Sequence, residues 1–288
     1  MRMDAPQDDQ PGTYVSTGTL PPAEQMQTLV DEAYERYRTD DEGVVADYIP
    51  ALADAAPSLF GISVVGVGGA VFSAGDTAVE FSMQSVSKPF VFALVCQAIG
   101  SCAARDHLGV NSTGLPFNSV MAVELNDDRT MNPMVNAGAI ATTSLVPGAT
   151  AEDKWAAIQQ GLSAFAGRTL TMDAEVYASE SATNLRNRGV AHLLESYGRL
   201  YFDPDEATDI DTRQCSLNVT AQDLAVMGAS LADGGVSGGI VTMSPGKGGL
   251  GTYSPRLDPA GNSVPGQRAT KFLSERLGLN LFASAPHR

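Results

Sequence analysis

Residues that commonly build metal or redox centres are scarce in this sequence, which has three cysteines and three histidines among 288 residues. Cys96, Cys102 and Cys215 form no C-x-x-C pair, and an odd, sparse set of cysteines is typical of reduced thiols in a cytosol. The histidines form no H-E-x-x-H motif and no cluster with cysteine. The sequence therefore predicts no zinc or other metal site.

Basic residues and long hydrophobic runs are also few. The 18 basic and 33 acidic residues give a formal net charge of −15, and such a surface repels phosphate backbones, so we expect no nucleic-acid partner. The longest apolar run, residues 90–99, is too short to span a bilayer. Residues 1–22 are polar and proline-rich, without the apolar stretch of a secretory signal, which predicts a disordered tail. We expect a soluble, cytoplasmic protein with no membrane partner.

Hydrophobic periodicity predicts strands near both ends of the chain and helices between them. Strands are expected at 61–67 and 70–75, as a hairpin, and at 238–245 and 249–255. Helices are expected at 23–38, 86–99, 150–167, 181–198, 220–235 and 265–279. This order predicts an α/β fold with an antiparallel sheet layer from both chain ends, flanked by helices, and an inserted all-helical region. We expect one domain over 23–288, with its sheet region at about 23–84 and 237–288 and its helical region at about 85–236.

The stretch FSMQSVSKPF, residues 81–90, places Ser85 three residues before Lys88. In a helix these positions share a face, so the lysine amine can reach the serine hydroxyl. A serine becomes a nucleophile when a base removes its proton, and a lysine serves as that base only if burial lowers its pKa. The alternative is an ordinary helix start with a solvent-facing lysine. These residues alone leave both interpretations open.

Longer stretches decide between them. Serine β-lactamases place S-x-x-K at the start of a buried helix, but their S-D-N and K-T-G signatures are absent here, so a lactam substrate is disfavoured. The stretches VADYIPALA (45–53), NPMVNAGAI (132–140) and RQCSLNVTAQDLAVM (213–227) closely resemble the serine-dependent glutaminases. The resemblance implies the β-lactamase/transpeptidase-like fold and hydrolysis of L-glutamine to L-glutamate and ammonia, without a cofactor. It also implies a homo-oligomer, either a dimer or a tetramer.

The resemblance assigns the chemistry to a few residues. Ser85 would attack the amide carbon and form an acyl-enzyme, and Lys88 would accept and relay the proton. Tyr48 would line the pocket near the nucleophile; the alternative is a core tyrosine before a proline turn. The backbone N–H groups of Ser85 and Val236 would form the oxyanion hole.

Three polar residues, Asn136, Glu180 and Asn187, are expected to bind the amino-acid end of the substrate. Glu180 and Asn187 are seven residues apart, so we predict that they share one helix face over two turns. There a carboxylate suits an α-ammonium group and an amide suits a carboxylate. Without the resemblance, Asn136 is equally well explained as a turn residue, and the other two as a solvated helix face.

The chain departs from the family pattern in two places. Relatives have a substrate-contacting tyrosine where this chain has Asp211, whose charge would oppose an amino-acid carboxylate. After Gly235, relatives continue for a few tens of residues that include a proton-shuttling tyrosine and a K-S-G-V turn, and this segment is missing here. Val236 stands at the join and can be aligned to either side. Residues 235–239 also match G-x-S-x-G, but between a helix and a strand, so Ser237 is disfavoured as a nucleophile.

These departures predict glutamine turnover below the family norm. The main alternative is a truncated, catalytically impaired glutaminase homologue with a binding or oligomer-forming role. A β-lactam-reactive serine hydrolase is the third and least favoured interpretation.

Overall fold

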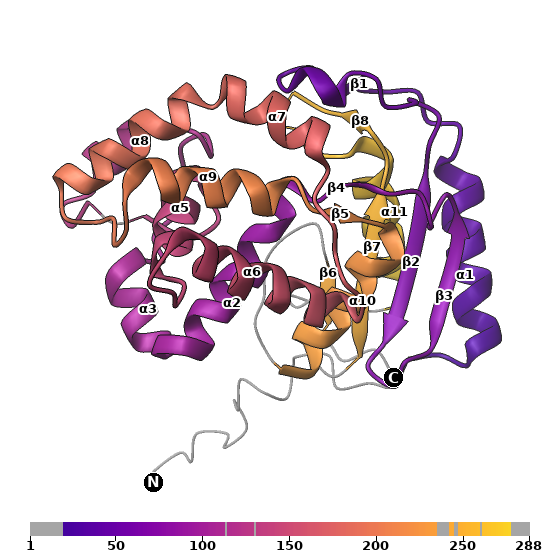
Figure 1. Cartoon of the computed structure of the whole chain (residues 1–288). Helices are drawn as coiled ribbons and strands as arrows, with labels where there is room; N and C mark the ends of the chain where they lie inside the picture. Colours follow the sequence, from indigo (N-terminus) through magenta and orange to yellow (C-terminus); the bar gives the residue numbers. More distant parts are fainter. Residues whose placement is uncertain are drawn as a thin grey trace, which may run out of the picture.

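In the computed structural model, a sheet region and a helical region lie side by side (Figure 1). The structure describes residues 20–112, 114–129, 131–234, 242–244, 247–259 and 261–277. Nearly all of the predicted tail, residues 1–22, lies outside these ranges. The main sheet is antiparallel, in the order β3-β2-β7-β6. Its strands are β2 (Gly61–Gly66), β3 (Val71–Gly75), β6 (Thr242–Ser244) and β7 (Gly248–Tyr253).

The sheet combines strands from both parts of the chain, as predicted. β2 and β3 form the expected hairpin, in which Val64 pairs with Phe72, and β7 lies on the other side of β2, where Leu250 pairs with Val64. Every residue of β2 is buried. A continuously buried strand requires cover on both faces of the sheet, and helices on each face provide it.

Helices α1 (Ala23–Tyr37) and α11 (Val264–Arg276) cover one face of the sheet. Their apolar stripes form one core with the side chains of β2 that point the same way, such as Ile62. Helix α10 (Ala221–Gly234) covers the opposite face, where Val65 packs on Ala225 and Ala229. The contact is close because β7 has no side chains there: a Cβ on Gly251 would lie 2.2 Å from the Ala221 carbonyl oxygen.

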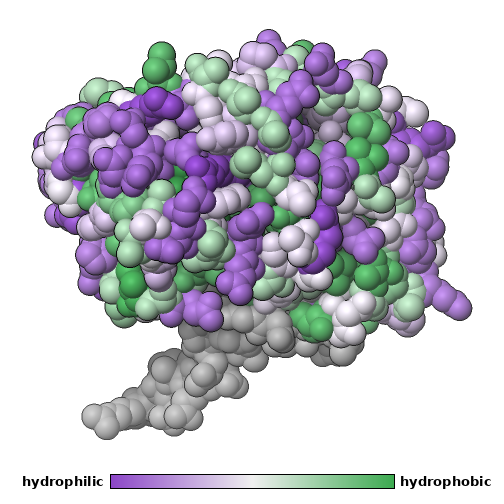
Figure 2. Space-filling view, viewed as in Figure 1, coloured by the Kyte–Doolittle hydropathy of each residue, from purple (hydrophilic) through white to green (hydrophobic). Residues whose placement is uncertain are grey.

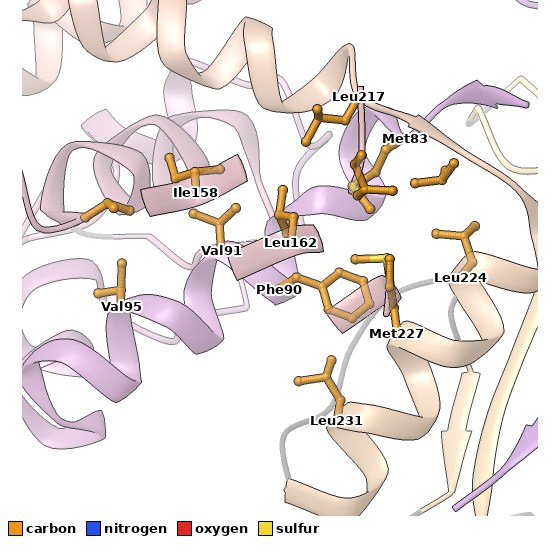
Figure 3. Packing of buried hydrophobic residues seen from close by; sticks show 14 of the residues in the cluster. Met83, Phe90, Val91, Val95, Ile158, Leu162, Leu217, Leu224, Met227 and Leu231 are labelled. Carbon is orange, nitrogen blue, oxygen red and sulfur yellow. The ribbon is translucent and has the colours of Figure 1, made fainter. Parts of the chain in front are cut away.

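The other side of α10 joins the sheet region to the helical region. Phe90 of α2 packs among Leu162, Met227 and Leu231, and the last two belong to α10 (Figure 3). The helix begins as predicted, because the Thr220 backbone N–H donates to Asp223 Oδ2 at 2.8 Å and the Asp223 N–H donates to Thr220 Oγ1 at 3.0 Å. Helix α10 therefore packs on both regions.

The helical region consists of α2 (Ser87–Ile99), α3 (Ser101–Leu108), α4 (Met121–Glu124), α5 (Asn136–Leu145), α6 (Ala151–Ala166), α7 (Ala174–Thr183), α8 (Leu185–Ser196) and α9 (Pro204–Cys215). Among the described residues, no single helix is long and apolar enough to cross a membrane. One pair of helical segments, 84–99 and 101–108, passes that test only when taken together, and it is bent by 120°. On the face shown in Figure 2, hydrophilic residues predominate and hydrophobic residues occur in small separate groups.

Short elements connect the two regions. Strand β4 (Phe81–Ser82) pairs with β5 (Asn218–Val219), and β1 (Val44–Val45) pairs with β8 (Arg256–Leu257). Two 3-10 turns, η1 (Pro50–Leu52) and η2 (Gln84–Val86), follow β1 and β4 along the chain. The β4–β5 pair brings η2 to the junction of the two regions, directly before α2.

Candidate active site

Ser85 lies in η2, where the chain turns from β4 into α2. The Met83 N–H donates to the Leu217 carbonyl at 2.8 Å, which fixes the start of this turn. Gln84 has φ of +50°, a left-handed conformation that is uncommon for a residue with a side chain. The Ser85 side chain is exposed, so its hydroxyl is accessible to a substrate.

Lys88, one turn later, is buried and only 5% exposed. Its Nζ donates to Asn136 Oδ1 at 2.8 Å and lies 5.8 Å from the centre of the Phe117 ring. Burial lowers the pKa of the Lys88 amine, although the nearby acidic groups, Asp211 first, oppose this effect. The solvent-facing alternative is therefore wrong. Within the described residues no hydrogen bond joins Lys88 to Ser85, and the amine is bound by Asn136 instead.

Asn136 also links Lys88 to Asn187. Asn136 is the first residue of α5, and its backbone N–H donates to the Phe117 carbonyl at 2.9 Å. Its side-chain Nδ2 donates to Asn187 Oδ1 at 3.2 Å. Three of the predicted site residues, from three different helices, are thus connected in one chain of hydrogen bonds.

The prediction that Glu180 and Asn187 share one helix is wrong. Glu180 lies on α7, which ends at Thr183, and Asn187 lies on α8, which begins at Leu185. Asn184 separates the two helices with φ −85° and ψ 20°, and its buried side-chain amide donates to Thr212 Oγ1 on α9 at 3.0 Å. This contact with a distant part of the chain stabilises a break that helical periodicity does not reveal.

Glu180 nevertheless faces the site from α7. Its Oε2 accepts a hydrogen bond from Gln84 Nε2 at 3.4 Å, directly beside Ser85. Burial, with repulsion from Asp211, raises the pKa of Glu180 to about 7, and Gln84 and Lys88 act in the opposite direction. Gln84 and Phe117 were not predicted as site residues, because only their position in the fold distinguishes them from other glutamines and phenylalanines.

Tyr48 lies at the edge of this group. It is 64% exposed, yet loss of water around its hydroxyl and the charge of Glu180 raise its pKa. The turn that follows Tyr48 is held on α7, since the Ala51 N–H donates to Ser179 Oγ at 3.2 Å. The core-tyrosine alternative is therefore wrong, and Tyr48 lies near Glu180.

Asp211 lies on the buried face of α9 and is 7% exposed. Its Oδ1 accepts hydrogen bonds from Gln214 Nε2 at 2.8 Å and from Thr143 Oγ1 at 3.4 Å. Burial raises the pKa of Asp211 to about 6, against the opposing effect of Lys88. Asp211 is thus close enough to Lys88 and Glu180 to interact with both.

Val236, which was predicted as an oxyanion donor, lies outside the described residues. So does Ser237, which was disfavoured as a nucleophile. The Ser85 N–H, predicted as the other oxyanion donor, belongs to the η2 turn.

The described residues include no group of three or more His, Cys, Asp or Glu side chains that could hold a metal ion. An open hollow of about 530 Å³ lies beside the starts of α6 and α9, and none of the predicted site residues line it.

Comparisons with known protein sequences agree on one family. The family model described as Glutaminase matches residues 43–236 and 232–282. Glutaminase 2 of Yersinia pestis is 53% identical over an alignment of 319 residues, which covers 95% of this chain and 94% of the relative. A glutaminase of Colwellia psychrerythraea is 41% identical, with 89% of this chain and 97% of the relative covered.

The same comparisons bear on the missing segment. The alignment with the Yersinia protein is longer than the 288 residues of this chain, so the relative has residues without a counterpart here. The two stretches matched by the family model overlap at residues 232–236. Both observations are what a missing internal segment near Val236 would produce.

Solved structures that match this fold are also described as glutaminases. A structure described as the probable glutaminase ybaS matches with a TM-score of 0.88 and 36% identity, covering 91% of this chain and 99% of that one. A probable glutaminase from Bacillus subtilis, complexed with 6-diazo-5-oxo-L-norleucine, matches with a TM-score of 0.74 and 25% identity, covering 92% and 98%. Together with the family match, these similarities show that the chain belongs to the glutaminase family and has its β-lactamase-like fold.

Proposed function

We propose that this chain hydrolyses L-glutamine to L-glutamate and ammonia, with Ser85 as nucleophile and Lys88 as base. The observation that carries the proposal is that an exposed Ser85 lies three residues before a buried Lys88, whose amine donates a hydrogen bond to Asn136 Oδ1 at 2.8 Å. Burial favours the neutral amine, which is the form that accepts a proton.

The reaction has two stages. Ser85 Oγ forms a bond to the side-chain amide carbon while Lys88 takes the hydroxyl proton. That proton passes to the amide nitrogen, the C–N bond breaks, and ammonia leaves an acyl ester on Ser85. Water then attacks the ester while Lys88 takes one of its protons, the bond between the acyl carbon and Ser85 Oγ breaks, and Lys88 passes that proton to Ser85 Oγ as glutamate leaves. The Ser85 N–H would stabilise the oxyanion of each stage, with Val236 as the proposed second donor.

The remaining site residues would orient the substrate. Glu180 would accept hydrogen bonds from the α-ammonium group, which a carboxylate suits. Asn136 and Asn187 would bind the amino-acid carboxylate, and Tyr48 would close the edge of the pocket. Support for these roles comes from the hydrogen bonds that connect Asn136 with Asn187 and Glu180 with Gln84.

A second candidate function is a truncated, catalytically impaired homologue that binds an amino acid or forms oligomers. The observation that favours it is that the family model matches the chain in two parts, which overlap at residues 232–236.

A cytoplasmic location and a homo-oligomer, either a dimer or a tetramer, are further parts of the main proposal. They rest on the sparse cysteines and on the family resemblance, and light scattering coupled to size-exclusion chromatography tests the assembly.

Ammonia release from L-glutamine tests the main proposal, with Ser85→Ala as the control. Release that exceeds the control supports hydrolysis through Ser85. Equal release from both proteins, with glutamine binding intact, favours the binding role. Acylation by a fluorescent penicillin tests the β-lactam alternative separately.

A further inference from the structure

Residues 41–57 form a surface segment that carries Tyr48 and packs on α7 through η1. Within this segment Ile49 is the one buried residue, and Tyr48 is 64% exposed. A segment that buries so little of its surface has low local stability. Its position therefore depends on the hydrogen bonds that anchor it to the rest of the protein.

Arg256 of β8 anchors this segment at both of its ends. Its Nη1 donates to the Asp41 carbonyl at 2.8 Å and to the Gly43 carbonyl at 3.3 Å, and its Nε donates to the Pro57 carbonyl at 3.2 Å. The backbone of Arg256 also pairs with Val45 where β8 lies beside β1. A guanidinium group has several donors fixed in one plane, so it can hold several carbonyls at once. One side chain therefore joins the start of the segment to its end.

The middle of the segment is anchored next to the site. The Ala51 N–H donates to Ser179 Oγ at 3.2 Å, and Ser179 directly precedes Glu180 on α7. Glu180 Oε2 in turn accepts a hydrogen bond at 3.4 Å from Gln84 Nε2 of η2, the turn that contains the nucleophile. These contacts hold the segment, and with it Tyr48, near that turn.

We propose that Arg256 is a positioning residue for substrate binding, which holds residues 41–57 against α7 and so keeps Tyr48 at the edge of the pocket. The inference rests on the proposed function, because it assumes that Tyr48 contacts the substrate. Without this anchor the segment would be closed in only a fraction of the molecules, and the apparent affinity falls by that fraction. Saturating substrate selects the closed form, so the chemical step keeps its rate.

Arg256→Gln removes the guanidinium group and keeps a polar side chain. We expect the dissociation constant of L-glutamine, measured by calorimetry in a Ser85→Ala background, to rise about tenfold. With Ser85 present, inactivation by 6-diazo-5-oxo-L-norleucine should need a similarly higher concentration for its half-maximal rate, at an unchanged maximal rate. Arg38→Gln removes an ion pair with Glu35 between exposed side chains at the end of α1. It is the matched control and should change neither constant.

Two further measurements separate this role from a general loss of stability. Amide hydrogen exchange in residues 41–57 should become faster in Arg256→Gln, whereas exchange in α10 should not change. In a Tyr48→Ala background, Arg256→Gln should have little further effect on glutamine affinity, because both changes remove the same contact.

The outcomes distinguish this inference from the proposed function. If glutamine binds and Arg256→Gln changes neither its dissociation constant nor the exchange of residues 41–57, the positioning role is refuted and the amidohydrolase proposal stands. If glutamine does not bind and 6-diazo-5-oxo-L-norleucine does not label Ser85, both proposals fail. Arg256→Lys serves as a second variant if the glutamine variant does not fold. A single amine reaches fewer carbonyls than a guanidinium group, so this variant should weaken binding in the same direction but less.

Discussion

Lys88 Nζ and Asn136 Oδ1 are joined by a hydrogen bond of 2.8 Å, from the first turn of α2 to the first residue of α5. This bond gives the buried Lys88 amine a hydrogen-bond partner that carries no negative charge. An amide oxygen stabilises the amine in place, whereas a carboxylate would also favour the charged form. This pairing is suited to a lysine that must be neutral when it takes a proton from Ser85.

Changing the amide to an acid therefore tests this pairing. Asn136→Asp places a carboxylate beside Lys88, which should raise the pKa of the amine and move the pH dependence of Ser85 acylation upward by roughly one unit or more. The measurement is the rate of inactivation by 6-diazo-5-oxo-L-norleucine as a function of pH. An unshifted profile would mean that Lys88 does not set the pH dependence.

Glu180 should contribute to binding through its charge. Glu180→Gln removes the partner of the α-ammonium group, and loss of a charge-assisted hydrogen bond costs about 1.5–3 kcal/mol, which corresponds to roughly ten- to a hundredfold in affinity. Calorimetry with glutamine measures it. Glu175→Gln, an exposed position on the same helix, is the control. Equal dissociation constants for both variants would show that Glu180 does not bind the α-ammonium group.

The buried Asp211 should make stability depend on pH. Burial raises the pKa of Asp211 from 3.8 to about 6, so between these values the folded protein holds a proton that the unfolded chain has lost. Stability is therefore lost as the pH rises through this window. Asp211→Asn removes the effect, so its stability relative to the wild type should increase by about 1.5 kcal/mol between pH 5 and pH 7.5.

Urea unfolding of both proteins at the two pH values measures this difference. Asp205→Asn is the control, since its carboxyl is exposed. A difference that does not change with pH would show that Asp211 keeps an ordinary pKa in the folded protein.

The sequence predicted the parts of this structure that depend on local patterns. The β2–β3 hairpin follows from two apolar runs around a glycine turn, and the start of α10 follows from Thr220 and Asp223. The break at Asn184 was missed because it depends on Thr212, which is distant in the sequence. The resemblance predicted Lys88, Asn136 and Asn187 as site residues. The hydrogen bonds between them could not be predicted, because they depend on how α2, α5 and α8 pack together.

Turnover of glutamine should be much weaker than is usual in the family. The missing segment near Val236 would remove the turn that presents an oxyanion donor, at a cost of about 2.7–4 kcal/mol in the barrier. A lost acid–base group typically costs another factor of roughly 10² to 10⁴, although such effects on one step do not add. The test is kcat with glutamine, before and after the segment of a relative is inserted between Gly235 and Val236. Full activity before insertion would show that nearby residues replace the missing parts.

The identity of the nucleophile is the central claim, and covalent labelling tests it even if turnover is weak. The protein is treated with 6-diazo-5-oxo-L-norleucine and analysed by intact mass and peptide mapping. Ser87→Ala is the matched control, because Ser87 is a neighbouring serine that is fully buried, with Oγ 3.9 Å from Cys215 Sγ. Lys88→Ala should abolish labelling, and Lys88→Arg should not restore it, since arginine stays protonated.

The account predicts a single adduct on Ser85, which persists in Ser87→Ala and disappears in Ser85→Ala. An adduct on Ser87 or Ser237 in the wild-type protein, or labelling of Ser85 at the wild-type rate in Lys88→Arg, would contradict it.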